Sequence, residues 1–198
     1  MKVHTLIAGV NGAGKSTFYK AMNIDFGIRV NLDEIIKEQF NNDWDNHKVQ
    51  MAAGRTAVEL IRNCISKGIS FNQETTLTGQ TIFSTVRKAK ANGFKINLYY
   101  VGLESVELSI ERVAMRVATG GHGIPEEDLR RRYKNSFENL NRILPLCDDI
   151  QIYDNSGSNT FDTLNPLLAV KNNIVVLSVS SYPQYLKDII DEFISELK

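Results

Sequence analysis

The sequence has few of the features that would cross-link the chain or anchor it in a membrane. Its 198 residues include two cysteines, Cys64 and Cys147, which lie far apart and form no CxxC pair. We therefore expect reduced thiols in the core instead of a disulfide or a metal site. No apolar run approaches the roughly 18 residues of a membrane span, and the short apolar run after Lys2 ends at a glycine-rich segment, unlike a signal peptide. These absences predict a cytoplasmic protein without membrane contact.

An excess of charge is also absent, because 23 lysines and arginines balance 23 aspartates and glutamates. This balance argues against an extended nucleic-acid or membrane surface. The three histidines, His4, His47 and His122, show no metal-ligand spacing. The chain also has no internal repeat and no low-complexity linker. We therefore expect one α/β domain over residues 1–198.

Strand-like and helix-like segments alternate along most of the chain. Strands are expected at residues 3–8, 28–32, 69–74, 95–101, 150–154 and 174–178. Helices are expected at residues 15–22, 34–40, 45–67, 80–92 and 105–118, from Pro125 as a first helical residue, and at 182–197, where the last helix covers the core. Residues 160–170, which include Pro166, are expected to be irregular. The alternation predicts a mostly parallel sheet with helices on both faces, whose ligands bind beyond the carboxyl ends of the strands.

One phosphate-binding motif is complete. Residues 9–16 match GxxxxGK[ST], directly after a predicted strand and directly before a predicted helix. Glycines let the backbone N–H groups point at phosphate oxygens, and the helix N-terminus adds partial positive charge. Lys15 can reach the β- and γ-phosphates, and the Ser16 hydroxyl can ligate Mg²⁺. The motif predicts a three-layer P-loop NTPase or kinase fold that binds ATP and Mg²⁺ through Gly9, Asn11, Gly12, Ala13, Gly14, Lys15, Ser16 and Thr17.

Other nucleotide-binding signatures are missing. The sequence contains no NKxD motif for guanine and no LSGGQ motif. It also lacks a clean Walker B strand, and residues 30–34 are the nearest approach to one. These absences disfavour a switch GTPase, a transporter motor and a bare ATPase.

Carboxylates and hydroxyls follow two of the predicted strands. Asp33 follows the second strand, where a carboxylate can accept the proton of an attacking hydroxyl. The alternative for Asp33 is an N-cap of the next helix. Glu74, Thr75 and Thr76 end the third strand, where they can hold the acceptor or phosphate oxygens, or form a polar strand end facing solvent.

Arginines flank a glycine-rich turn at residues 120–123. Guanidinium groups stabilise the charge of a transferring phosphoryl group, and a glycine hinge can close them over the nucleotide. We favour Arg116, then Arg112, then Arg132 as catalytic, against a solvated basic face. His122, within the turn, either contacts substrate or accommodates an unusual backbone angle.

Asn155 follows a late strand near the expected position of the nucleotide base. It is a candidate adenine contact, with an ordinary Asx turn as the alternative.

Several segments together resemble the zeta-toxin family of P-loop kinases. They are residues 11–17, 31–34, 72–76, 112–122, 132–133, 139–140 and 153–156, in matching order. The resemblance implies transfer of the γ-phosphate of ATP to the 3′-hydroxyl of a UDP-N-acetyl sugar such as UDP-N-acetylglucosamine. It assigns the base role to Asp33, acceptor binding to Glu74 and catalysis to two arginines. It also implies a toxin whose antitoxin is encoded separately.

Two alternatives stay open at this point. One is a P-loop kinase for another hydroxyl acceptor, such as an antibiotic, a nucleoside or a sugar acid. The other is a nucleotide-binding toxin module that acts through a protein partner. The segment at Glu74 and the arginine hinge favour the sugar-nucleotide acceptor.

Overall fold

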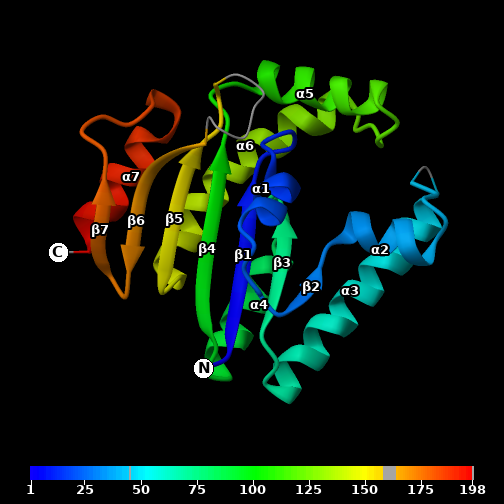
Figure 1. The fold of residues 1–198 in the computed structure, drawn as a ribbon, viewed down its shortest axis with the longest axis horizontal. Coiled ribbons are helices and arrows are strands. Elements are labelled where there is room, and N and C mark those ends of the chain that lie inside the picture. Colours follow the sequence, from blue (N-terminus) through cyan, green and yellow to red (C-terminus); the bar gives the residue numbers. More distant parts are fainter. Residues whose placement is uncertain (45, 158–163, 198) are drawn as a thin grey trace.

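The computed structural model describes residues 1–44, 46–157 and 164–197. Within these residues, seven strands form one sheet in the order β2-β3-β1-β4-β5-β6-β7 (Figure 1). The strands are β1 (Val3–Gly9), β2 (Ile28–Val30), β3 (Phe71–Thr75), β4 (Lys95–Gly102), β5 (Asp149–Asp154), β6 (Asn165–Lys171) and β7 (Ile174–Ser178). The helices are α1 (Lys15–Ala21), α2 (Leu32–Gln39), α3 (His47–Lys67), α4 (Thr81–Ala91), α5 (Val106–Ala118), α6 (Glu126–Ile143) and α7 (Gln184–Glu196), with a short 3₁₀ helix at Leu144–Leu146.

The sheet is parallel from β2 to β5. β1 lies between β3 and β4, and β2 pairs with the outer side of β3. β5 continues the parallel order beside β4. This arrangement confirms the predicted α/β fold, and it brings the carboxyl ends of β1, β2 and β3 to one edge of the sheet.

The expectation of irregular structure at residues 160–170 is wrong for its second half. Residues 165–171 form β6, which runs antiparallel to β5. Pro166 pairs with Tyr153 where the register of the two strands shifts. A proline lacks the N–H that a regular ladder needs, but it is tolerated near a strand start and at an irregularity. Residues 160–163 lie outside the described residues.

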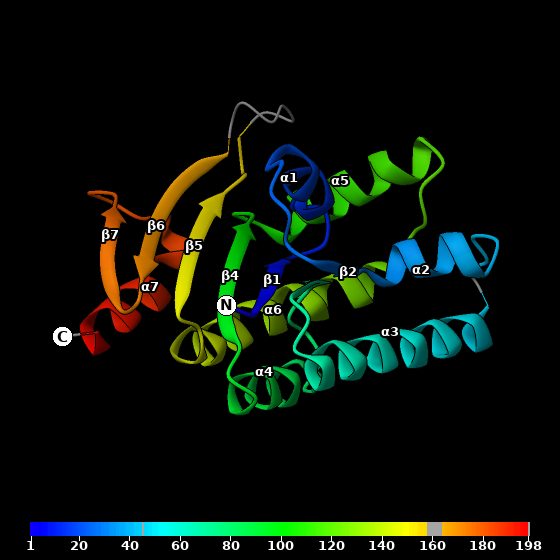
Figure 2. The same cartoon turned by 60° about the horizontal axis from the view of Figure 1, so that its bottom comes forward.

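The apolar core is unequal on the two faces of the sheet. The larger cluster joins the sheet to α3, α4, α6 and α7. On the other face, α1 contributes Phe18 to a smaller cluster with Ile7 and Val101. Figure 2 shows α1 on one side of the sheet and α3 and α4 on the other. Neighbouring residues of β1 point to opposite faces, since Leu6 belongs to the first cluster and Ile7 to the second.

Most helices begin one or two residues away from the predicted start, and at two of them the shift concerns a residue that the sequence singled out. α2 begins at Leu32, and the Asn31 side chain caps it by accepting a hydrogen bond from the Asp33 backbone N–H. The capping alternative for Asp33 is therefore wrong, because Asn31 occupies the cap. Pro125 is the residue before α6 and not its first helical residue. Its fixed φ suits this position as well as the first turn.

α2 and α3 form an arm of their own beside the sheet (Figure 1). Ile35 and Ile36 of α2 and Ala53 of α3 are buried together, with Trp44 and Val49 packed against them. Among the described residues, no helix combines the length and hydrophobicity that a membrane crossing requires. Cys64 and Cys147 are buried and free.

The far edge of the sheet is apolar and exposed. Every residue of β7 is exposed, including Ile174 at 67% and Val176 at 62%. α7 instead buries Leu186, Ile190 and Phe193 against the main core, as the sequence predicts for a helix that covers the sheet.

Replacing Ile190 by alanine should destabilise the protein. Ile190 is fully buried in the main core, so Ile190→Ala should lower the free energy of unfolding by about 2–5 kcal/mol. The matched control is Ile174→Ala on exposed β7, which should change it by no more than about 0.5 kcal/mol. Urea denaturation measures both. Equal losses from the two variants would show that α7 does not cover the core.

Candidate active site

The phosphate loop lies where β1 ends and α1 begins, beside the ends of β2 and β3 (Figure 1). Its glycines are required by close contacts. Gly9 has φ 145°, and a Cβ there would lie 2.1 Å from the Val101 carbonyl oxygen. Gly14 has φ 88°, and a Cβ there would lie 3.0 Å from Asn155 Nδ2. Side chains at these positions would distort the loop.

Lys15 places a cation inside this loop. The residue is 8% exposed, and its Nζ donates a hydrogen bond of 2.9 Å to the Val10 carbonyl oxygen. Burial lowers the pKa of Lys15, while the carboxylates of Glu74 and Asp33 act in the opposite direction. A buried ammonium in a loop of this shape fits a phosphate, whose negative charge would offset the cost of burial.

Glu74 joins the phosphate loop to the neighbouring strands. Its Oε1 accepts a 2.8 Å hydrogen bond from Ser16 Oγ, the predicted Mg²⁺ ligand. Its Oε2 accepts from Arg29 Nη2 at 2.7 Å and from Asn31 Nδ2 at 2.9 Å. The side chains of Glu74 and Arg29 are 11% and 12% exposed. The sequence interpretation assigned Glu74 to the acceptor, whereas the structure also places it against Ser16.

Arg29 is a residue that sequence reasoning missed. It lies on β2, its Nε donates to both carboxylate oxygens of Glu34 at 2.8 and 2.9 Å, and its guanidinium lies 3.7 Å from the Tyr19 ring centroid. Its Nη1 donates to Asn72 Oδ1 at 3.2 Å. A charged residue between two apolar residues of a three-residue strand was the available signal, since such a charge needs a partner when buried.

Asp33 lies at the mouth of the site, with its side chain 49% exposed. Partial burial raises the pKa of its carboxyl, and the negative charge of Glu74 adds to the increase. The positive charges of protonated His122, Arg116 and Lys15 act against it, and the net shift is upward. A carboxylate with a raised pKa is a better proton acceptor than an ordinary aspartate.

Arg116 and His122 lie together beside Asp33. Arg116 Nη2 lies 3.3 Å from His122 Nε2 and donates to the His122 carbonyl oxygen at 2.9 Å. His122 Nε2 lies 3.9 Å from Asp33 Oδ2. The imidazole stacks on Trp44 with 3.9 Å between ring centroids and 11° between planes. Trp44 was not singled out from the sequence, because it follows no motif and meets His122 only through the fold.

The other predicted arginines have different surroundings. Arg112 Nη2 donates to the Gly157 carbonyl oxygen at 3.0 Å. The Arg112 Cβ also lies against Gly12 of the phosphate loop, at 3.1 Å from where a Cβ on that glycine would be. Arg132 Nη2 lies 3.8 Å from Asp128 Oδ2, and its positive charge contributes to lowering the pKa of His122. Arg116 is therefore the predicted arginine that the structure brings into contact with the Asp33–His122 pair.

Thr75 and Thr76 mainly hold the turn after β3. Thr75 Oγ1 accepts a 3.0 Å hydrogen bond from the Leu77 backbone N–H, and Thr76 Oγ1 lies 3.0 Å from Thr78 Oγ1. The turn is further fixed by Asn139, whose Nδ2 donates to the Leu77 carbonyl oxygen. This geometry supports the precise placement of Glu74, which precedes the turn.

Asn155 contacts the phosphate loop directly. Its Nδ2 donates a 2.9 Å hydrogen bond to the Ala13 carbonyl oxygen. The turn expected here is instead closed by the neighbouring Asp154, which accepts from the Ser156 backbone N–H. Ser109 of α5, also missed from the sequence, donates to the Asn11 carbonyl oxygen at 2.7 Å. Both side chains brace the loop through its carbonyl groups.

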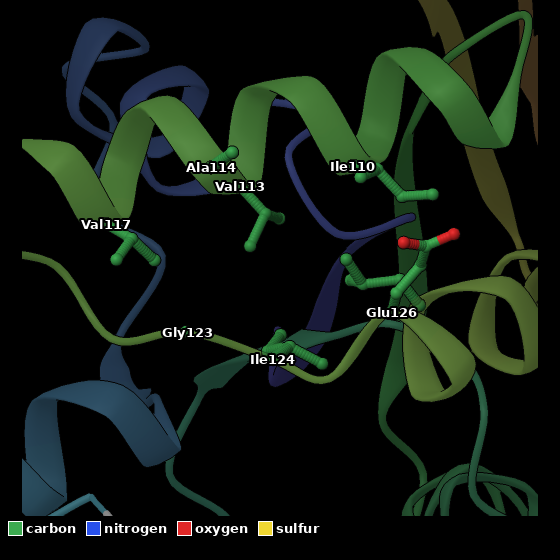
Figure 3. A pocket seen from close by; sticks show the side chains of 8 residues that line it. Ile110, Val113, Ala114, Val117, Gly123, Ile124 and Glu126 are labelled. Carbon is green, nitrogen blue, oxygen red and sulfur yellow. The ribbon is translucent and has the colours of Figure 1, made fainter.

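An apolar pocket of about 250 Å³ lies under α5. Ile110, Val113 and Val117 of the helix line it, and Figure 3 shows Val113 and Val117 pointing toward the segment that carries Gly123 and Ile124. This segment connects His122 to α6. The pocket lacks the cations of the phosphate site, so we do not assign it to the nucleotide.

A family model for the zeta toxin matches residues 1–165. The chain belongs to the zeta toxin family. The match includes every predicted site residue and ends at the start of β6. An uncharacterized protein of Haemophilus influenzae is 35% identical over 125 residues, which span 63% of this chain and 88% of that protein.

Two solved structures share the fold of this chain. The PezAT chromosomal toxin–antitoxin system of Streptococcus pneumoniae matches with a TM-score of 0.63 and 19% identity, over 100% of this chain and 87% of that one. The complex of AvrRxo1-ORF1 and -ORF2 with ATP matches with a TM-score of 0.68 and 13% identity, over 98% of this chain. This chain spans 64% of the length of the matched chain in that complex. At these identities, the likeness shows the fold.

The ion pair of Arg29 and Glu74 should stabilise this family member measurably. Arg29→Met keeps much of the side-chain length but leaves Glu74 without its cation in a mostly buried position, so we expect a loss of about 3 kcal/mol in the free energy of unfolding. The matched control is Arg131→Met, since Arg131 is 58% exposed and should change stability by less than about 0.5 kcal/mol. Denaturant titration compares them. A loss as small as the control's would show that the Arg29–Glu74 pair does not hold the site together.

Proposed function

We propose that the chain transfers the γ-phosphate of ATP to a hydroxyl group of a small molecule. The acceptor that we favour is a UDP-N-acetyl sugar such as UDP-N-acetylglucosamine, phosphorylated at its 3′-hydroxyl. The observation that carries the proposal is the position of Asp33. A half-exposed carboxylate with a raised pKa lies at the same edge of the sheet as the phosphate loop, within the electrostatic reach of Lys15.

Each site residue has a role in this reaction. Lys15 and the loop backbone hold the β- and γ-phosphates, and Arg116 neutralises charge on the transferring group. Asp33 orients the acceptor hydroxyl and takes its proton while the acceptor oxygen bonds to phosphorus and the bond to ADP breaks. Ser16, supported by Glu74, would hold Mg²⁺, which neutralises phosphate charge when bound.

The cation arrangement supports a nucleotide in this position. Among the described residues, seven buried side-chain atoms have no hydrogen-bond partner, and three of them, Asn11 Oδ1, Arg112 Nε and Arg116 Nε, belong to predicted site residues. Buried polar atoms are normally paired, so a nucleotide or its water that reached these three atoms would supply the partner that each of them lacks. The AvrRxo1 structure of the same fold contains ATP, which is consistent with this placement.

We also propose a protein partner. The PezAT structure describes a toxin–antitoxin system, so a separately encoded antitoxin is the expected inhibitor of this chain. The balanced charge of the sequence gives no support for nucleic acid as a partner.

Transfer should depend on Asp33. Phosphorus NMR of the protein with ATP, Mg²⁺ and UDP-N-acetylglucosamine should show a new phosphomonoester, and Asp33→Asn should lower its rate of formation by about 10²–10⁴-fold. Asp33→Asn should still bind ATP, whereas Lys15→Met should lose both binding and transfer.

Two results would change this proposal. Near-full transfer by Asp33→Asn would remove the base role of Asp33. ADP release without a new phosphomonoester would reject this acceptor and leave other hydroxyl acceptors, such as a nucleoside, to be screened.

As pH decreases, the rate of phosphate transfer should begin to fall at a higher pH than it would with an ordinary aspartate as the base. A general base works only when ionised, and the pKa of Asp33 is raised, so kcat/KM should fall as pH decreases through that raised value. The folded protein also holds this proton more tightly than the unfolded chain, so Asp33 lowers stability as pH rises through the same window. Asp33→Asn should therefore raise the melting temperature above that window. A pH series of rates and melting curves tests both, and a limb at the ordinary aspartate pKa contradicts the assignment.

A further inference from the structure

Two loops from opposite sides of the site meet in one aromatic contact. Trp44 comes from the α2–α3 connection and His122 from the α5–α6 connection, and their rings stack almost in parallel. Gln50 Nε2 donates to the Trp44 carbonyl oxygen at 2.6 Å, and Trp44 Nε1 donates to Asn42 Oδ1 at 3.0 Å. The stack therefore fixes the plane of the imidazole and turns one edge toward Arg116 and Asp33.

The hydrogen bond from Arg116 determines the protonation of this edge. An arginine side chain has N–H donors and no acceptor, so His122 Nε2 can pair with Arg116 Nη2 at 3.3 Å only through its lone pair. This pairing requires a neutral imidazole with its proton on Nδ1. Partial burial and the positive charges of Arg116 and Arg132 keep its pKa low, although the charge of Asp33 opposes them.

The same nitrogen also lies 3.9 Å from Asp33 Oδ2. This distance is too long for a hydrogen bond, but a small shift of either side chain would allow one to form. The charged groups around the imidazole come from three elements: Asp33 from α2, Arg116 from α5 and Arg132 from α6. Trp44, from the fourth packed segment, adds no charge. Nε2 thus has one cationic and one anionic neighbour, and only one of them can be its hydrogen-bond partner at a time.

We propose that His122 is a positioning residue that exchanges Arg116 for Asp33 when nucleotide binds. Arg116 turns from the imidazole to the phosphates, and Nε2 then takes up a proton from solvent. The imidazolium donates a hydrogen bond to Asp33 and holds this carboxylate ionised and oriented toward the acceptor hydroxyl. The proposal rests on the function proposed above, since it needs a phosphate that attracts Arg116.

Charge balance explains why such an exchange is useful. The positive charge of Arg116 helps to keep Asp33 ionised in the absence of nucleotide. Phosphates draw that charge away and add negative charge, and both changes favour a protonated Asp33 that cannot act as a base. A proton on His122 replaces the lost positive charge beside Asp33. Asp33 thus stays ionised when nucleotide is in place.

The chain contains a direct probe of this step. Trp44 is its one tryptophan, and a protonated imidazole quenches a stacked indole more strongly than a neutral one. Selective excitation of tryptophan across a pH series should therefore give the midpoint of His122. Mg²⁺ with a non-hydrolysable ATP analogue should raise this midpoint by about 1–2 pH units.

Three variants distinguish this exchange from the alternative that the negative charge of the phosphates alone raises the midpoint of His122. His122→Gln should abolish the fluorescence transition, which assigns it. Arg116→Met should raise the midpoint without nucleotide and leave little further shift on binding, because the donor that blocks Nε2 is already gone. Arg130→Met is the control, since Arg130 is paired with Glu107 and Glu126 on the surface and should behave as wild type.

Calorimetry of the binding of the same analogue shows whether a negative result contradicts the exchange alone or the proposed function as well. If the analogue binds and the midpoint stays constant, or if it rises equally in Arg116→Met, the exchange is wrong while the proposed function stands. If no nucleotide binds, both are wrong. A transition that persists in His122→Gln also overturns the exchange.

The pH dependence of transfer gives a second readout. His122→Gln should shift the acidic limb of kcat to higher pH, because Asp33 loses its cationic neighbour, while the KM for ATP stays nearly constant. A purely structural role for His122 would lower kcat without moving the limb, and that result would overturn the proposal.

Discussion

The Glu74 carboxylate is the contact on which the site depends. It bonds Ser16 of the phosphate loop through one oxygen, and Arg29 of β2 and Asn31 of the α2 cap through the other. Asn31 in turn fixes the first turn of α2, where Asp33 lies. One side chain thus sets the distance between the loop that holds phosphate and the helix that carries the proposed base. Its burial makes each of these bonds stronger than it would be at the surface.

The site places three cations around two carboxylates. Lys15, Arg29 and Arg116 surround Glu74 and Asp33, and each of the five residues lies in a different helix or strand. Lys15 and Arg29 are mostly buried and hydrogen-bonded, so the fold holds these two charges in position before any ligand arrives. Preorganised charge of this kind stabilises a transferring phosphoryl group without the reorganisation that water would need.

Local patterns in the sequence predict the sheet, most helices and the phosphate loop, because strand periodicity and the glycine motif act over short distances. The carboxyl-end rule also brings Asp33 and Glu74 to one edge. Arg29 and Trp44 could not be found in this way, since their partners lie in other elements and no spacing records the contact. β6 was missed because Pro166 argues against a strand unless the register shift beside Tyr153 is known.

The order of the strands also separates the site from the exposed edge of the sheet. The phosphate loop follows β1, whereas β7 lies beyond β4, β5 and β6, and within the described residues no strand covers its outer side. The opposite edge, β2, has three residues and lies against α3. β7 is therefore the longer of the two edge strands, and its side chains are exposed. A strand added at this edge would be separated from β1 and its phosphate loop by β4, β5, β6 and β7.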